Sequence, residues 1–235
     1  MIKQLLEKVR QYAKEGLFHI FGSKVLSQVG GLISSMVVIR FLEKAAYGHY
    51  VNAVNLYSYP AMFVGMGMTN VIMQYCSEKV SDERKASIYR HGLLVGHGAN
   101  FLVVAAMLVM AVWKYQTGKP ETALFLILMC GLPFVDYMNA FAQTALRVKL
   151  KNHVFSNANT ISTVVLLLGN IILTKFFDIE GLIYSRYLSY FVAMTICISA
   201  LQKERFFGRM ITEGKRLVGE DRKEINNYAF VFIYI

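Results

Sequence analysis

Three ionisable residues lie inside long apolar stretches of the sequence: Lys24, Asp136 and Arg186. A charged side chain at the depth of a bilayer costs at least ~2.5 to 3.5 kcal/mol on insertion scales, and it usually marks an ion pair or a path for a charged solute. Lysine and arginine are suited to phosphate and carboxylate groups. The short Asp136 side chain must pair with a cation or take up a proton, whereas Lys24 and Arg186 are near enough to the membrane boundaries that snorkelling stays an alternative.

Amide, hydroxyl and small residues recur at helical spacing in the same stretches. An unsatisfied polar group in hydrocarbon costs several kcal/mol, so these faces must meet one another or water. Two interpretations stay open, namely hydrogen bonds between helices at ~0.6 kcal/mol each and the lining of a cavity. The GxxxG spacing over 92–96 fits close helix packing. The candidate cavity residues are Lys24, Gln28, Asn52, Asn55, Tyr59, Asp136, Asn139, Gln143, Asn159, Asn170 and Arg186.

Prolines and glycines interrupt two of these stretches. Pro60 lies in the middle of one, with Gly65 and Gly67 just after it, and Pro133 precedes Asp136 by three residues. Proline removes a backbone hydrogen bond and bends a helix. We expect these four residues to form kinks. Such a kink can be a gate that bends during function or a fixed bend, and the sequence leaves both interpretations open.

The elements that position these residues must be membrane helices. Of the 235 residues, 55% are hydrophobic and only 17% are charged, which is too little charge to cover the surface of a soluble domain. A spanning helix needs ~20 mostly apolar residues. Six stretches qualify, over 17–39, 47–75, 91–113, 122–146, 154–177 and 181–201. The predicted fold class is all-α, an integral membrane protein with a bundle of six transmembrane helices.

Four regions follow along the chain. Residues 1–16 form a basic amphipathic segment, 17–201 the six-helix bundle, 202–227 a mixed-charge linker, and 228–235 an apolar strip too short to cross as a helix. This strip either folds back against the bundle or begins a seventh span. We favour the second interpretation, in which the chain is a piece of a larger transporter.

Basic residues are distributed unevenly between the loops. With the N-terminus inside, 18 Lys and Arg fall in cytoplasmic segments and 5 in external loops. This asymmetry predicts a multi-pass protein of the cell membrane with the N-terminus in the cytoplasm. It also accounts for the formal charge of +10 without a nucleic-acid partner. The three cysteines and five histidines are scattered, so no metal site or disulfide framework is expected.

A motif at the start of the second span resembles a known family. Arg40 precedes an apolar pair, and Tyr47, Gly48 and Tyr50 form a tyrosine-glycine-x-tyrosine pattern. This order is similar to the start of the polysaccharide biosynthesis (O-antigen type) flippases. Those proteins belong to the multidrug/oligosaccharidyl-lipid/polysaccharide exporter superfamily.

Two further features extend the resemblance over essentially the whole chain. Gln143 followed by Arg147 resembles the family's approach to a cytoplasmic arginine, and Gly181 stands where the family has a glycine opening the sixth span. The chain departs from the pattern at Glu43 and Lys44, which replace the usual spacer.

The resemblance implies one six-helix lobe of a two-lobed exporter that works by alternating access. Such proteins turn an undecaprenyl-pyrophosphate-linked oligosaccharide from the inner to the outer leaflet. It also implies Lys24 and Arg186 as candidate contacts for the phosphates, and Asp136 as a candidate titrating group if an ion gradient drives transport. No cofactor is expected, and the implied partners are the lipid-linked oligosaccharide, membrane lipid and other polysaccharide-assembly proteins.

Three other functional classes are alternatives to the flippase. A drug or cation antiporter of the same superfamily would favour an acidic and aromatic lining. A membrane enzyme acting on lipid-linked sugars would need paired carboxylates or long external loops, whereas the loop over 114–121 has about eight residues. A bare scaffold would not need ionisable groups at depth. The sequence therefore favours a transporter over an enzyme.

Overall fold

The computed structural model describes residues 22, 25, 28–32, 36, 38–40 and 42–231. Every regular element in this part of the chain is a helix, as the sequence predicts. The elements are α3 (Lys44–Ala61), η1 (Val64–Gly67), α4 (Met68–Ser77), α5 (Asp82–Gln116), α6 (Pro120–Leu128), η2 (Met129–Gly131), α7 (Leu132–Val148), α8 (Asn152–Phe177), α9 (Glu180–Gln202), α10 (Phe206–Thr212) and α11 (Glu220–Val231).

Four helices are long and apolar enough to cross a membrane. They cover Asp82–Gln116, Pro120–Val148, Asn152–Phe177 and Glu180–Gln202, where α6, η2 and α7 together make the second. They coincide with the third to sixth predicted spans, so the chain is a membrane protein. Most of the first predicted span, including Lys24, lies outside the described residues. The count of six helices therefore stays a prediction.

The second predicted span, 47–75, is not one continuous helix. α3 ends at Ala61, and α4 begins only at Met68. Between them Gly65, Met66 and Gly67 all have positive φ, at 66°, 48° and 72°. Left-handed residues cannot continue a right-handed helix, and glycine adopts this conformation without the steric cost that a side chain adds. The sequence signal predicts a bend, and the structure has a full break.

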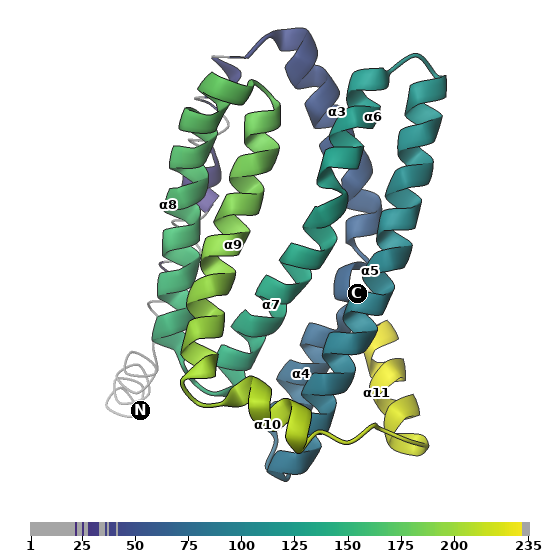
Figure 1. Ribbon diagram of the computed structural model, residues 1–235, viewed down its shortest axis with the longest axis vertical. Helices are drawn as coiled ribbons and strands as arrows, with labels where there is room; N and C mark the ends of the chain where they lie inside the picture. The colour runs from purple at the N-terminus through teal and green to yellow at the C-terminus, as the bar shows by residue number, and fades with distance from the viewer. Residues whose placement is uncertain are drawn as a thin grey trace, which may run out of the picture.

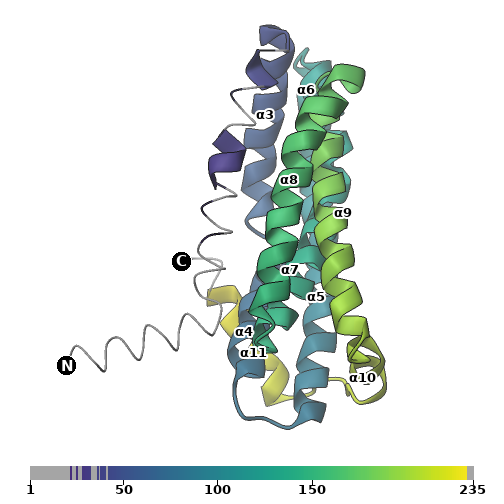
Figure 2. The ribbon, with the colours of Figure 1, turned by 90° about the vertical axis from the view of Figure 1, so that its left-hand side faces the viewer.

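The long helices α3, α5, α8 and α9 run roughly along the long axis of an elongated bundle (Figure 2). α8 and α9 lie side by side over their length, and α7 runs obliquely across the bundle to pack against α9 (Figure 1). α5 packs against α6 along one half of its length and against α4 and η1 along the other. α10 lies across the lower end of the bundle in Figure 1, and α11 returns beside α4.

Small residues let α8 and α9 approach closely. The hydroxyls of Ser162 and Ser189 lie 2.7 Å apart, and each donates in turn to the other's backbone carbonyl, at 3.2 and 3.0 Å. A Cβ on Gly169 would stand 3.1 Å from the Ser185 hydroxyl. Short polar and small side chains of this kind are what hold membrane helices together.

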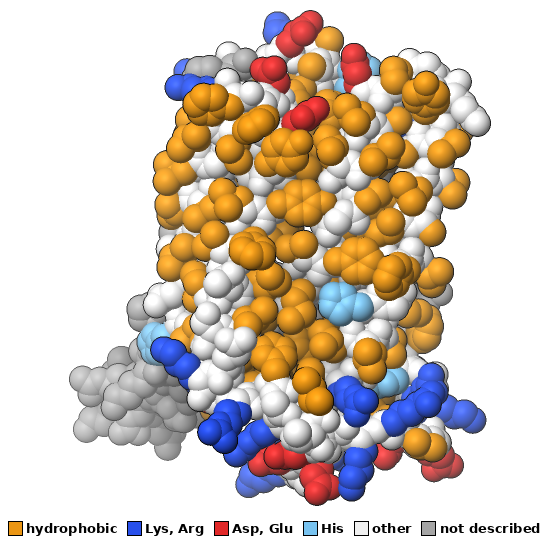
Figure 3. Space-filling view, in the orientation of Figure 1, with side chains coloured by type: hydrophobic (Ala, Val, Ile, Leu, Met, Phe, Trp, Pro, Cys, Tyr) orange, Lys and Arg blue, Asp and Glu red, His pale blue; other side chains and the backbone are white. Residues whose placement is uncertain are grey.

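Charge separates the two ends of the molecule. An apolar band covers the middle, Lys and Arg gather at the lower end, and Asp and Glu predominate at the upper end (Figure 3). This matches the loop asymmetry of the sequence, and the N-terminus-inside orientation stays a prediction. The described basic residues of the lower end are Lys79, Arg84, Lys85, Arg90, Arg147, Lys149, Lys151, Lys203, Arg205, Arg209, Lys215, Arg216, Arg222 and Lys223.

The strip after the linker packs against the bundle as far as the structure describes it. Tyr228 contacts Tyr75 edge to face, with ring centroids 5.3 Å apart, and Ala229 is buried. The backbone of Ala229 lies so close to Gly67 that no Cβ fits at Gly67. Residues 232–235 lie outside the described part, so a seventh span stays a prediction.

Candidate functional site

A cavity of about 270 Å³ lies between α3, α8 and α9 in the upper half of the bundle. We call it the Arg186 chamber. Two candidates from the sequence, Asn170 and Arg186, line it together although they come from different helices. The full lining is Gly31, Val38, Tyr47, Tyr50, Val51, Val54, Leu166, Asn170, Leu182 and Arg186.

Arg186 is the cation of this chamber. Its guanidinium interacts electrostatically with Asp136 on α7 and with Tyr50, Tyr57 and Tyr190. It comes within 4.0 Å of no carboxylate oxygen among the described residues, so Asp136 attracts it without forming a contact ion pair. The positive charge is therefore balanced from a distance while its N–H donors stay open to an anion.

Two tyrosines of α3, Tyr47 and Tyr50, line the chamber, although the sequence analysis named them only as part of the family motif. Tyr47, Tyr50 and Tyr57 recur at intervals of three and seven along α3, which places them on one face. The Tyr50 ring packs edge to face against Phe125 of α6, with centroids 6.3 Å apart. A tyrosine offers both an apolar ring and a hydroxyl that needs a partner. The signal that finds these residues is the helical spacing of aromatic residues, not of amides.

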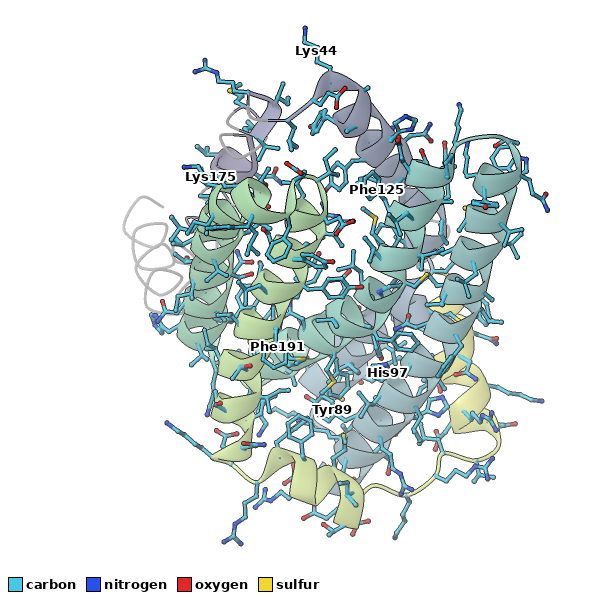
Figure 4. All side chains as sticks on the ribbon, turned by 45° about the horizontal axis from the view of Figure 1, so that its top comes forward. Lys44, Tyr89, His97, Phe125, Lys175 and Phe191 are labelled. Atoms are coloured by element: carbon cyan, nitrogen blue, oxygen red, sulfur yellow. The ribbon has the colours of Figure 1, made fainter. Side chains whose placement is uncertain are left out.

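The upper end of the bundle surrounds this wall. Figure 4 looks down on it, with Lys44 and Lys175 extending from the end itself and Phe125 lying between α6 and α3. On α9, Tyr187 donates its hydroxyl to the backbone oxygen of Leu128, 2.8 Å away, and so fastens α9 to the end of α6. The chamber is thus bounded by elements that are tied to one another at this end.

Several other candidates lie elsewhere. Asn139 is buried, and its Oδ1 accepts a hydrogen bond from Gln143 Nε2, one turn later, at 3.1 Å. These two amides therefore bond to each other within α7. Tyr59 is exposed and borders a separate apolar groove between α3 and α5. Asn52, Asn55, Asn159 and Gln28 do not line the Arg186 chamber either, and Lys24 lies outside the described residues.

Asn100 is a structural residue that the sequence analysis did not single out. It is fully buried in α5. Its Oδ1 accepts the backbone N–H of Gly65 at 3.0 Å, and its Nδ2 donates to the backbone oxygen of Pro133 at 2.9 Å. One side chain thus links the break after α3 to the start of α7. The available signal was a lone amide within the apolar stretch 91–113.

Tyr137 fills the space beside this link. Its hydroxyl donates to the backbone oxygen of Gly92 at 2.5 Å. Its ring lies against Gly65 on one side and Gly96 on the other, so that neither glycine has room for a Cβ. The GxxxG pair therefore packs closely, Gly96 against Tyr137 and Gly92 against Ile72.

A family model described as polysaccharide biosynthesis protein matches residues 13–216. The chain belongs to this family. The match to the polysaccharide biosynthesis protein family covers every helix from α3 to α10, and with them Asp136 and Arg186. α11 lies beyond it. Neither a curated protein nor a solved structure matches the chain.

Proposed function

We propose that the chain is the first lobe of an exporter that turns an undecaprenyl-pyrophosphate-linked oligosaccharide across the cytoplasmic membrane. Membership of the polysaccharide biosynthesis protein family supports a role with lipid-linked sugars. The transporter consists of two six-helix lobes that alternate between inward-open and outward-open arrangements. It needs no cofactor, and an ion gradient acting through Asp136 supplies the energy.

The observation that carries this proposal is the placement of Arg186 in a cavity at membrane depth. A pyrophosphate cannot enter hydrocarbon without compensating positive charge. A guanidinium whose donors are not engaged by a carboxylate provides that charge and binds phosphate oxygens in a bidentate manner. Asp136, within electrostatic range, offsets the cost of leaving Arg186 charged when substrate is absent.

The tyrosines give the chamber affinity for a sugar as well as for a phosphate. The rings of Tyr47 and Tyr50 present apolar faces, and their hydroxyls pair with sugar hydroxyls. At about 270 Å³ the chamber is just below the usual range of ~300 to 1,000 Å³ for small-molecule sites. It therefore holds the phosphates or a single sugar, and the rest of the oligosaccharide lies between the two lobes.

The link through Asn100 provides a way to bend the lobe. Gly65 and Pro133 are both weak points of their helices. Because Asn100 bonds to the backbone of both, movement at one is transmitted to the other. We assign Pro60, Gly65, Gly67 and Pro133 to the segments that change between the two arrangements.

A cation antiporter is the second candidate, because Tyr47 and Tyr50 line the chamber and Asp136 lies within electrostatic range of its Arg186. The positive charge of Arg186 has opposite effects on the two functions. An anionic substrate requires its charge, whereas a cationic substrate is repelled by it.

Substituting Arg186 distinguishes them. In cells that depend on the intact protein for surface polysaccharide, Arg186→Gln lowers export by about 10 to 100 fold, the value of a charge-assisted hydrogen bond. Arg186→Lys keeps part of the activity. The matched control is Lys119→Gln, an exposed cation at the same end of the molecule. Normal export by Arg186→Gln at equal membrane abundance excludes the flippase, and increased cation efflux establishes the antiporter.

A further inference from the structure

A second cavity, of about 390 Å³, lies at the lower end of the bundle, far from the Arg186 chamber. We call it the basal cavity. It is formed where residues 90–95 of α5 meet the segment between α10 and α11 and the first turn of α11. Its lining contains no acidic residue, and it consists of Arg90, His91, Leu94, Val95, Lys215, Arg216, Leu217 and Arg222.

Backbone and side-chain hydrogen bonds hold this cavity in shape. Arg90 Nη1 donates to the backbone oxygen of Gly214 at 2.7 Å, and the Lys215 backbone N–H donates to the Ser87 hydroxyl at 2.9 Å. His91 is hydrogen-bonded to the Asn226 side chain at 2.9 Å. Gly214 lies against the backbone carbonyls of Met210 in α10 and Ala86 in α5, with no room for a Cβ. The wall is therefore a packed segment and not a chance gap between surface side chains.

The positive charge of the cavity is largely uncompensated. Lys215 lies 3.7 Å from Glu83, in a pair whose side chains are both mostly exposed. Arg216 and Arg222 form no ion pair with any carboxylate in the part of the chain that the structure describes. Figure 3 shows the resulting concentration of Lys and Arg at the lower right, below the apolar band. Arginine donors in this arrangement are suited to a phosphate group.

An apolar surface continues upward from the same cavity. Leu94 lines it, and Phe101 and Leu108 follow at intervals of seven on the same face of α5, with 64%, 67% and 44% of each residue exposed. Two residues of the linker, Ile211 and Val218, are also exposed among basic neighbours. Exposed apolar residues interleaved with Lys and Arg are characteristic of a segment at the membrane interface.

We propose that the basal cavity binds the phosphate headgroup of an anionic phospholipid in the leaflet at the lower end of the bundle. The arginines hold the phosphate, and an acyl chain lies along Leu94 and Phe101. The charge selects an anionic lipid, and the adjoining apolar face selects a lipid over a soluble phosphate. The site is independent of the Arg186 chamber, because no residue lines both.

A tryptophan beside the cavity reports which lipid occupies it. Trp113 is the single tryptophan of the chain and lies at the opposite end of α5, so Trp113→Phe combined with Leu94→Trp gives one local fluorophore. The chain is reconstituted in phosphatidylcholine with increasing brominated phosphatidylglycerol, which quenches only when bound nearby. We expect quenching to exceed that by brominated phosphatidylcholine at equal mole fraction.

Two matched double variants in this background separate the site from general surface charge. Arg216→Gln with Arg222→Gln weakens the preference for phosphatidylglycerol roughly 30-fold. This corresponds to about 1 kcal/mol of attraction to an anionic membrane surface for each arginine. Lys79→Gln with Lys203→Gln removes the same charge from exposed positions at the same end and leaves the preference intact. Both variants leave the hydrogen bonds of Arg90 and Lys215 in place.

Three results would overturn the proposal. The first is equal quenching by both brominated lipids. The second is an equal loss of preference in the two double variants, which would reduce the effect to net charge. The third is displacement of brominated phosphatidylglycerol by soluble glycerol phosphate at a matching concentration, which would make the cavity a site for free phosphate.

Discussion

Asn100 accepts the backbone N–H of Gly65 at 3.0 Å, although the two residues lie 35 positions apart. The same amide donates to the Pro133 carbonyl. The Gly65 N–H lies outside helical pairing because left-handed residues interrupt the chain there, and Pro133 belongs to the first turn of α7. In hydrocarbon such groups must find a partner inside the protein. Asn100 therefore stabilises the break between α3 and α4 by pairing with its backbone.

Replacing Asn100 with leucine tests this role. The side chain keeps its approximate size but leaves the Gly65 N–H without its partner and removes the hydrogen bond to the Pro133 carbonyl. We expect a loss of about 1 to 3 kcal/mol in the free energy of unfolding, the cost of buried unsatisfied polar groups. The midpoint of thermal unfolding in detergent measures it. Thr195→Val is the control, because its exposed hydroxyl bonds only within α9, and unchanged stability in Asn100→Leu would contradict the account.

Two neighbouring glycines of α5 are expected to respond to alanine with opposite signs. Gly96 lies against the Tyr137 ring, whereas a Cβ on Gly98 meets nothing within 4 Å. Overpacking makes Gly96→Ala cost ~1 to 3 kcal/mol. Gly98→Ala gains ~0.5 to 1 kcal/mol from helix propensity.

The double variant Gly96→Ala with Tyr137→Leu identifies the cause of that cost. Relative to Tyr137→Leu alone, the added alanine should then be nearly neutral, because the ring that it meets is gone. Equal penalties in the two backgrounds would show that Tyr137 is not the residue that excludes a side chain at Gly96.

The helical content and the third to sixth spans were predictable from sequence, because apolar length alone fixes where a chain can cross a membrane. Which polar face meets which helix was not. The amides of Asn139 and Asn170 look alike in sequence, yet one bonds within its own helix and the other lines the chamber. Helical spacing defines a face, but the crossing of helices decides what that face contacts.

The break at 65–67 was underestimated for a related reason. Glycine and proline indicate local weakness, and the sequence therefore predicts a bend. A full break also requires a distant group to satisfy the freed backbone, and that group, Asn100, is 35 residues from Gly65 along the chain. Single-sequence patterns carry no information on such pairings.

Glu204 predicts a specific dependence of stability on pH. Hydrogen bonds from Lys149, at 2.7 Å, and from Lys151 lower the pKa of this carboxyl from its ordinary 4.5 to about 2. A pKa that is lowered on folding stabilises the folded state above the ordinary value, and that contribution is lost as the pH falls through the folded value.

Glu204→Gln should therefore be less stable than the native chain at neutral pH. Because the side chain is about one third exposed, the difference stays within about 1 kcal/mol. It should shrink between about pH 4.5 and about pH 2, where the native carboxylate takes up its proton. The free energy of unfolding of both proteins, measured across this range, gives this difference. Glu43→Gln is the control, because it removes a carboxylate from an exposed position at the opposite end. A constant difference over the whole range would contradict the ion-pair explanation.

Lys24 lies outside the described residues, and its role rests on the sequence alone. If it contacts the phosphates of the substrate, Lys24→Ala loses export and Lys24→Arg keeps it, because the second substitution retains the charge. Surface polysaccharide, measured at equal membrane abundance, gives the comparison. Equal loss in both variants would argue against a simple charge role.

The proposed function requires that the Arg186 chamber holds water and carries a positive potential. It is tested with Val54→Cys in a chain whose Cys76, Cys130 and Cys197 are replaced by alanine. The introduced thiol is treated with two methanethiosulfonates of similar size, the anionic sulfonatoethyl and the cationic trimethylammonioethyl reagent. Leu168→Cys, on the exposed face of α8, is the control.

We predict that Val54→Cys reacts with both reagents while Leu168→Cys stays protected by lipid. Relative to a free thiol in solution, the anionic reagent should be favoured at Val54→Cys. Adding Arg186→Gln should lower the ratio of the anionic to the cationic reaction rate by about fivefold, the effect of one nearby charge in a solvated site. A Val54→Cys thiol as unreactive as Leu168→Cys, or one whose preference does not change with Arg186→Gln, would contradict the account.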